Sequence, residues 1–162
     1  MIRRVIADCS ADFADIEGVD YRLVPLTIST DERSFTDDED LDVNEMLDYL
    51  SKYNGPSRTA CPGIEQWINS YEGADEVFVV TLSEGLSGTY NAAVTAGNLY
   101  VEEHPNAKVH VFDSLSAGPE VRMLADRIAE YVRDGKSSDE IIALGDDYIR
   151  QSRIFFALES FH

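Results

Sequence analysis

The sequence predicts an α/β domain in which helices cover both faces of a mostly parallel β-sheet. Apolar, β-branched runs suited to buried strands alternate with segments of helical periodicity along nearly the whole chain of 162 residues. Such alternation is typical of βαβ units, in which a crossover helix joins two parallel strands. The length fits a single domain over residues 1–162, and a hydrophobic fraction of 44% supplies enough side chains for a core.

The first half of the chain is expected to hold one clear strand, a second extended segment and two helices. Asp42 or Asn44 is suited to cap the first helix, because short polar side chains accept hydrogen bonds from free amides. Gly55-Pro56 ends that helix, and Pro62 is favoured at the start of the next. The expected elements are a strand at 4–8, an extended segment at 21–29, an acidic loop at 36–40, a helix around 46–50, a loop at 58–63 and a helix around 64–71.

The second half continues the alternation. Val121, Leu124 and Ile128 recur at helical spacing, and Glu140 is placed to complete a capping box with Ser137 or Ser138. The helix around 92–97 is lined with small residues, which allow a close approach to a sheet. The expected elements are a strand at 76–82, that small-residue helix, a strand at 108–112, a helix at 119–133, a helix after 137 or 138, and a last strand at 153–158.

The charge of the chain excludes some partners. With 31 acidic and 13 basic residues the formal net charge is −18, which disfavours nucleic acid and anionic lipid surfaces. No apolar run approaches the ~20 residues of a membrane span, so no stable membrane insertion is expected. Two cysteines and three scattered histidines, without metal-binding spacing, predict no metal site and a reducing cytoplasm.

The segment Val77–Ala93 carries the main functional signal. A buried strand is predicted to deliver Ser87, Gly88 and Thr89 to the start of a helix. Free backbone amides, two hydroxyls and the positive end of the helix dipole then meet at one point. Such a point binds an anionic head group, either a carboxylate or a phosphate. Because the loop contains no Lys or Arg, recognition there depends on neutral donors.

Polar residues follow three of the predicted strands. They are Asp8–Ser10, Ser83–Thr89 and Asp113-Ser114. Ligands of parallel α/β sheets bind beyond the carboxyl ends of the strands, so we expect these residues to gather along one edge. The carboxylate of Asp8 is expected to tie adjacent loops together by hydrogen bonds.

Known catalytic motifs are incomplete at this edge. A haloacid-dehalogenase pattern needs a second aspartate where Ser10 stands, and a nucleophile elbow needs glycine in place of Thr89. Neither His104 nor His110 is placed as a general base. There is no P-loop and no G-x-G-x-x-G motif. Cys61 is expected to be a small residue in a pocket wall.

Five blocks of the sequence resemble, in order, the signatures of the DegV family. These bacterial fatty-acid-binding proteins are also known as the FakB subunit of fatty acid kinase. The resemblance covers essentially the whole chain, and its most specific part is Leu-Ser-Gly-Thr-Tyr. The blocks are 5–12, 24–27, 58–62, 82–93 and 111–114.

The resemblance implies that the protein binds a long-chain fatty acid and presents its carboxylate to a separate, ATP-dependent kinase subunit. That subunit would make the acyl-phosphate, so this chain is expected to be no enzyme and to carry no cofactor besides the bound fatty acid. The family's head-group contacts correspond here to Thr59, Ser87 and the amide of Gly88. We expect supporting roles for Asp8, Ser10, Cys61, Thr89, Asp113 and Ser114.

Two features set this chain apart from the family pattern. The family often has Ser and Gln where Ala60 and Cys61 stand here. Family members also continue into a second domain that helps to enclose the acyl chain, so the chain is expected to be a truncated N-terminal domain.

Two alternatives to the lipid carrier stay open at this point. One is an enzyme or binding protein for a small phosphorylated metabolite at the Ser87-Gly88-Thr89 loop. The other is an interaction module whose acidic face binds a basic partner.

Overall fold

The body of the protein is a four-stranded parallel sheet. The computed structural model describes residues 1–12, 15–155 and 157. The strands lie in the order β2-β1-β6-β7, and every neighbouring pair is parallel. The predicted fold class is confirmed. The strands are β1 (Arg3–Asp8), β2 (Asp20–Val24), β6 (Glu76–Thr81) and β7 (Lys108–Asp113).

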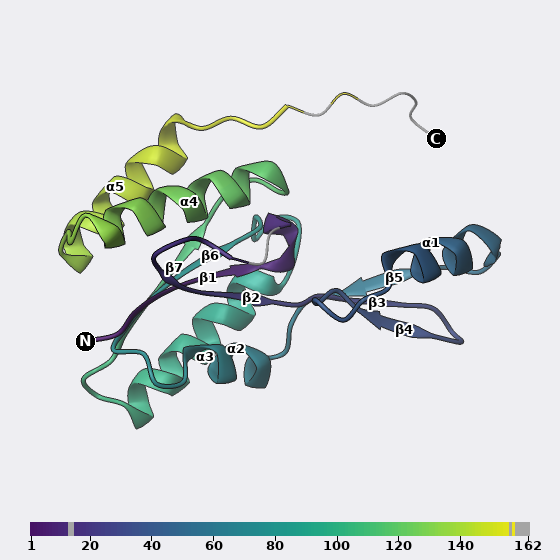
Figure 1. Cartoon of the computed structure of the whole chain (residues 1–162), viewed down its shortest axis with the longest axis horizontal. Helices are drawn as coiled ribbons and strands as arrows, with labels where there is room; N and C mark the ends of the chain where they lie inside the picture. The colour runs from purple at the N-terminus through teal and green to yellow at the C-terminus, as the bar shows by residue number, and fades with distance from the viewer. Residues whose placement is uncertain (13–14, 156, 158–162) are drawn as a thin grey trace.

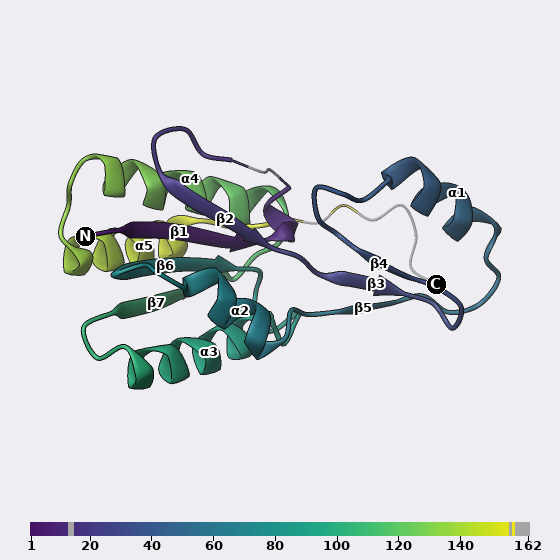
Figure 2. The same cartoon turned by 60° about the horizontal axis from the view of Figure 1, so that its bottom comes forward.

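Helices cover both faces of this sheet, as Figures 1 and 2 show. Side chains alternate along β1, so Val5 and Ala7 pack in one core and Ile6 in the other. The core of Val5 is closed by α4 (Pro119–Arg133) and α5 (Ser138–Gln151). The core of Ile6 is closed by α2 (Ile64–Tyr71) and α3 (Thr89–Glu103).

A second, antiparallel sheet projects from the carboxyl edge of the body (Figure 2). Its strands lie in the order β4-β3-β5, and α1 (Val43–Lys52) packs on it, with the ring centroids of Phe35 and Tyr49 5.6 Å apart. We call β3, β4, β5 and α1 together the arm. The strands are β3 (Thr27–Ser29), β4 (Ser34–Thr36) and β5 (Arg58–Ala60).

The arm corrects two predictions. The extended segment expected at 21–29 is two strands, separated at Pro25-Leu26. Proline has no N–H to donate, and the Leu26 amide donates to Cys9 Sγ over 3.2 Å, so neither residue continues a ladder. The loop expected at 58–63 begins as strand β5, which pairs with β3.

The remaining predicted elements are mostly confirmed. The side chain of Asp42 caps α1 by accepting from the Glu45 amide over 2.9 Å. Ser137 and Glu140 form the capping box of α5. The strand expected at 153–158 is wrong for residues 153–155 and 157, which have no regular structure. Phe156 and Leu158 lie outside the described residues.

Glycines let two helices approach β7 closely. A Cβ atom at Gly97 of α3 would lie 2.9 Å from Val109 Cγ1. A Cβ atom at Gly145 of α5 would lie 2.5 Å from Phe112 Cε1. Real Cβ atoms do not approach carbon so closely, so these positions set the spacing between helices and sheet.

Gly145→Ala is therefore expected to destabilise the fold although alanine favours a helix. The gain in helix propensity is about 1 kcal/mol, whereas overpacking a core costs about 1–3 kcal/mol. We expect the free energy of unfolding to fall by roughly 1 kcal/mol in urea titrations. Gly85→Ala is the matched control, because its Cβ would meet only Ser83 Oγ at 3.6 Å. An increase in stability for Gly145→Ala would contradict the packing argument.

Candidate functional site

The loops that follow β1, β6 and β7 meet at the carboxyl edge of the parallel sheet. The Leu82 amide donates to Asp8 Oδ2 over 2.7 Å. The Glu84 amide donates to Asp113 Oδ1 over 3.2 Å, and the Ser114 amide donates to the Thr81 carbonyl over 3.2 Å. These bonds confirm the predicted gathering of polar residues along one edge.

Asp8 fixes the first of these loops. Its carboxylate is fully buried, and Oδ1 accepts from both the amide and the hydroxyl of Ser10. Burial raises the pKa of Asp8 above its ordinary value, while the bonds from Ser10 and Leu82 act in the opposite direction. Asp8 and Ser10 thus hold the backbone around the edge.

Asp113 and Ser114 hold the loop after β7. Asp113 Oδ1 also accepts from the Leu115 amide over 3.0 Å, where the backbone takes the left-handed conformation with φ 52°. Ser114 is buried, and its Oγ accepts from the Ser116 amide over 3.2 Å. Both side chains bond within the loops.

The start of α3 is the predicted anion-binding point. The Thr89 amide donates to Ser87 Oγ over 3.2 Å, and the hydroxyls of Ser87 and Thr89 lie 3.0 Å apart. Thr89 is fully buried, whereas Gly88, the residue before the first helical turn, is exposed. Because Ser87 Oγ accepts from an amide, its own proton is available for Thr89 or for an anion. The first-turn amides have no acceptor within the helix.

The segment between β5 and α2 lies against this helix start. A Cβ atom at Gly88 would be 3.4 Å from Cys61 Sγ, which is ordinary van der Waals contact. Cys61 and Thr59 are exposed, and Thr59 is the register partner of Ile28 in β3. The structure therefore brings the 58–62 segment to the loop that carries Ser87. Contact of Thr59 and Ser87 with one ligand stays a prediction.

Sequence reasoning missed the role of Cys9. Its thiol is buried at the base of the arm, where it accepts from the Leu26 amide. Burial, aided by the neighbouring Asp37 carboxylate, raises the pKa of Cys9 to about 12. Cys9 thus links β1 to the arm as a neutral thiol. No sequence pattern indicates the bond between Cys9 and Leu26, because this bond depends on the break between β2 and β3 at Pro25-Leu26.

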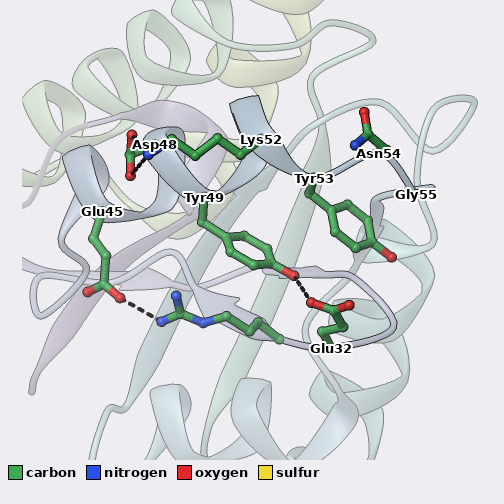
Figure 3. A pocket seen from close by; sticks show the side chains of 9 residues that line it. Glu32, Glu45, Asp48, Tyr49, Lys52, Tyr53, Asn54 and Gly55 are labelled. Atoms are coloured by element: carbon green, nitrogen blue, oxygen red, sulfur yellow. Dashed lines mark hydrogen bonds and ion pairs between the residues drawn. The ribbon is translucent and has the colours of Figure 1, made fainter.

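The arm carries a hollow of about 700 Å³ between α1 and the β3–β4 turn. Figure 3 shows the Tyr49 hydroxyl directed at Glu32, and Lys52 beside Asp48. Arg33 pairs with Glu45 over 2.6 Å, and Lys52 pairs with Asp48 over 2.6 Å. Both cations already have carboxylate partners, so the hollow does not present an unpaired positive charge of Arg33 or Lys52 to an anionic ligand.

The described residues contain no group of three or more side chains suited to hold a metal ion. None of the helices in residues 1–12, 15–155 and 157 combines the length and apolar character needed to cross a membrane.

Comparison with known proteins gives a consistent result. A family model described as an uncharacterised protein of the DegV family matches residues 3–162. A DegV domain-containing protein of Streptococcus gordonii is 35% identical in an alignment of 162 positions, which covers 98% of this chain and 58% of that protein. The chain therefore spans a little over half the length of this relative.

Two solved structures are similar in fold and sequence. A DegV family protein from Eubacterium eligens, described as loaded with heptadecanoic acid, is 45% identical with a TM-score of 0.89, over 92% of this chain and 54% of that chain. The Streptococcus pneumoniae Fatty Acid Kinase (Fak) B3 protein, described as loaded with linoleic acid, is 34% identical with a TM-score of 0.89. That match covers 93% of this chain and 55% of that chain.

The raised pKa of Asp8 predicts a pH-dependent contribution to stability. The folded state holds the Asp8 proton more tightly than the unfolded chain does, so the contribution grows as pH falls through the folded pKa towards about 3.9. Asp8→Asn removes this proton site. We expect the difference in unfolding free energy, wild type minus variant, to increase between pH 7 and about pH 4 in urea titrations.

Asp12→Asn, at an exposed position four residues along the chain, controls for the change in net charge. If the difference in unfolding free energy for Asp8→Asn shrinks on acidification, the bonds from Ser10 and Leu82 lower the pKa of Asp8 by more than burial raises it, which would contradict this prediction.

Proposed function

Because this chain belongs to the DegV family, we propose that it binds a long-chain fatty acid with the carboxylate at the start of α3. The observation that carries this proposal is the arrangement of Ser87, Gly88 and Thr89 at the first turn of a 15-residue helix, with the 58–62 segment against it. The fatty acids named for the two solved relatives support the ligand class.

The head group is held by neutral donors. The Ser87 hydroxyl and the Gly88 amide donate to the carboxylate, the positive end of the α3 dipole favours its charge, and Thr59 donates from β5. Hydrogen bonds to a charged group are worth about 1.5–3 kcal/mol each. The 83–89 loop contains no Lys or Arg, so at the start of α3 the carboxylate is bound by neutral donors and its oxygen atoms stay open to a reaction partner.

The acyl chain needs an apolar surface beside the head group. Leu86 and Leu115 lie in the two edge loops, and each is 63% exposed. We propose that a second domain, outside residues 1–162, covers this region and encloses the tail. The greater length of the relatives supports this proposal. Burying a tail is worth about 0.8 kcal/mol per CH₂.

The carboxylate is presented to a separate kinase subunit, which transfers phosphate to it. The name of the pneumococcal relative, a Fatty Acid Kinase B3 protein, supports this partner. The edge residues described above act in binding and in holding the loops, so the chain is proposed to be the lipid-binding subunit and not the catalyst. The bound fatty acid is its only proposed ligand.

Removal of the two hydroxyls tests the head-group contacts. Thr59→Ala combined with Ser87→Ala is expected to weaken fatty-acid binding on the order of 100-fold, because two charge-assisted hydrogen bonds are lost. Affinity is measured by calorimetry, and copurified lipid is measured by mass spectrometry, in the whole protein that contains this chain. Thr36→Ala with Ser51→Ala is the matched control, since both are exposed residues of the arm away from β5. Unchanged lipid content in the double variant would overturn the assignment.

The dependence of affinity on acyl-chain length distinguishes a lipid carrier from a protein that binds a phosphorylated metabolite at the same helix start. For the carrier, affinity should rise about fourfold per CH₂ from dodecanoate to hexadecanoate. Amide chemical shifts of Ser87 and Gly88 should move with these acids. If inorganic phosphate and sugar phosphates bind at these amides while fatty acids do not, the metabolite is the ligand.

A further inference from the structure

A cavity of about 330 Å³ lies between the loop after β7 and the end of α5, and we call it the α5 cavity. Its walls include Ser116 and Glu120 on one side and Ile149 and Ile154 on the other. The Ser83 amide donates to the Ser116 carbonyl over 2.8 Å, so the wall is bonded to the loop that leads into α3. The α5 cavity thus lies at the same edge of the sheet as the proposed head-group site.

Two polar atoms in the wall of the α5 cavity are buried without a hydrogen-bond partner among the described residues. They are the Oγ of Ser116, a residue that is 3% exposed, and the Oε1 of Glu120. The backbone of Ser116 is already bonded, because its amide donates to Ser114 Oγ and its carbonyl accepts from Ser83. An unpaired polar atom is costly to bury, so both atoms favour a partner that enters the cavity.

The two arginines of the wall do not neutralise the Glu120 carboxylate. Arg150 donates to Asp147 over 3.3 Å. Arg153 donates to the carbonyls of Arg150 and Ser152 over 2.8 Å and 2.5 Å. Neither arginine pairs with Glu120 in the part of the chain that the structure describes. The carboxylate therefore disfavours a second anion here, and a neutral hydrogen-bonding group suits the cavity better.

We infer that the α5 cavity recognises a hydroxyl group on the acyl chain, so that the protein selects hydroxylated long-chain fatty acids. A hydroxyl both donates and accepts: it donates to Glu120 Oε1 and accepts from Ser116 Oγ, which pairs both atoms. The apolar side chains of Leu115, Ile149 and Ile154 pack against the neighbouring methylene groups. The inference rests on the proposed function, because it requires the carboxylate to be held at the start of α3.

Water is the other group that can pair these two atoms. One water molecule takes up about 30 Å³ in the liquid, so the 330 Å³ of the α5 cavity also has room for part of an acyl chain. An unsubstituted chain that displaces such water loses its hydrogen bonds, whereas a hydroxylated chain reproduces them. The hydroxylated acid is therefore preferred whether the empty cavity is hydrated or dry.

The experiment compares the affinity of octadecanoate with that of its monohydroxy positional isomers, by calorimetry on the whole protein that contains this chain. Because the carboxylate is fixed, the hydroxyl reaches Ser116 and Glu120 only from a narrow range of chain positions. We expect about tenfold tighter binding than octadecanoate for one isomer or a few adjacent isomers, as for one or two neutral hydrogen bonds. A profile in which no isomer exceeds octadecanoate would overturn the inference.

Ser116→Ala tests whether the preference arises in the α5 cavity. The variant is expected to bring the affinity ratio of the best isomer to octadecanoate from about ten to near one, because the donor is lost. Its thermal unfolding midpoint should not fall, because the hydroxyl that it removes has no partner in the described residues. Ser51→Ala, at an exposed position of α1, is the matched control and should keep the ratio.

The outcomes separate this inference from the proposed function. A preference that survives Ser116→Ala would place the hydroxyl elsewhere and overturn the inference, while fatty-acid binding stands. If that variant does not fold, the positional profile of the unmodified protein decides. If neither octadecanoate nor any isomer binds, the proposed function itself fails.

Discussion

The buried carboxylate of Asp8 joins the ends of two neighbouring parallel strands. It accepts from the Leu82 amide directly after β6 and from Ser10, two residues after the end of β1. A buried carboxylate is costly unless its oxygens are bonded, and here the bonds come from the loops that leave the sheet. The hydrogen bonds that offset the free-energy cost of burying this carboxylate therefore also fix where the Ser83–Thr89 loop begins. The start of α3 follows a few residues later, so its position depends on this bond.

This construction bears on the proposed binding of an anionic head group by a strongly acidic protein. With a net charge of −18, long-range electrostatics oppose a carboxylate ligand, and the 83–89 loop contains Glu84 but no cation. The attraction has to come from short-range donors, namely first-turn amides and the Ser87 hydroxyl. Short-range donors act only when their positions are fixed. In the proposed site, the network of Asp8, Asp113 and Ser114 therefore acts by fixing the positions of these donors and not through its charge.

The sequence predicts the body of the fold and the edge more fully than it predicts the arm. The helix at Pro119–Arg133 is found with the predicted bounds, because its apolar spacing and N-terminal proline both mark it. Strands of three residues, such as β3 and β5, are too short to show a period of two. Cys61 and Gly88 lie near each other although they are 27 residues apart in the sequence, and no local pattern indicates this proximity. The final strand expected at 153–158 rested on apolar residues alone.

The arm makes the proposed site depend on a second junction. Among the described strands, β5, which carries Thr59, pairs with β3 alone, and β3 leaves the body through Pro25-Leu26. The Leu26 amide donates to the Cys9 thiol, and the Leu26 carbonyl accepts from the Asp37 amide over 2.9 Å. Leu26 therefore binds both the body and the arm at the point where one passes into the other. The placement of β5 relative to the body therefore depends on the bond between Cys9 and Leu26 at the base of the arm. Because Cys9 directly follows Asp8, one short segment at the end of β1 bonds to both elements that form the proposed head-group site, the loop after β6 and the arm.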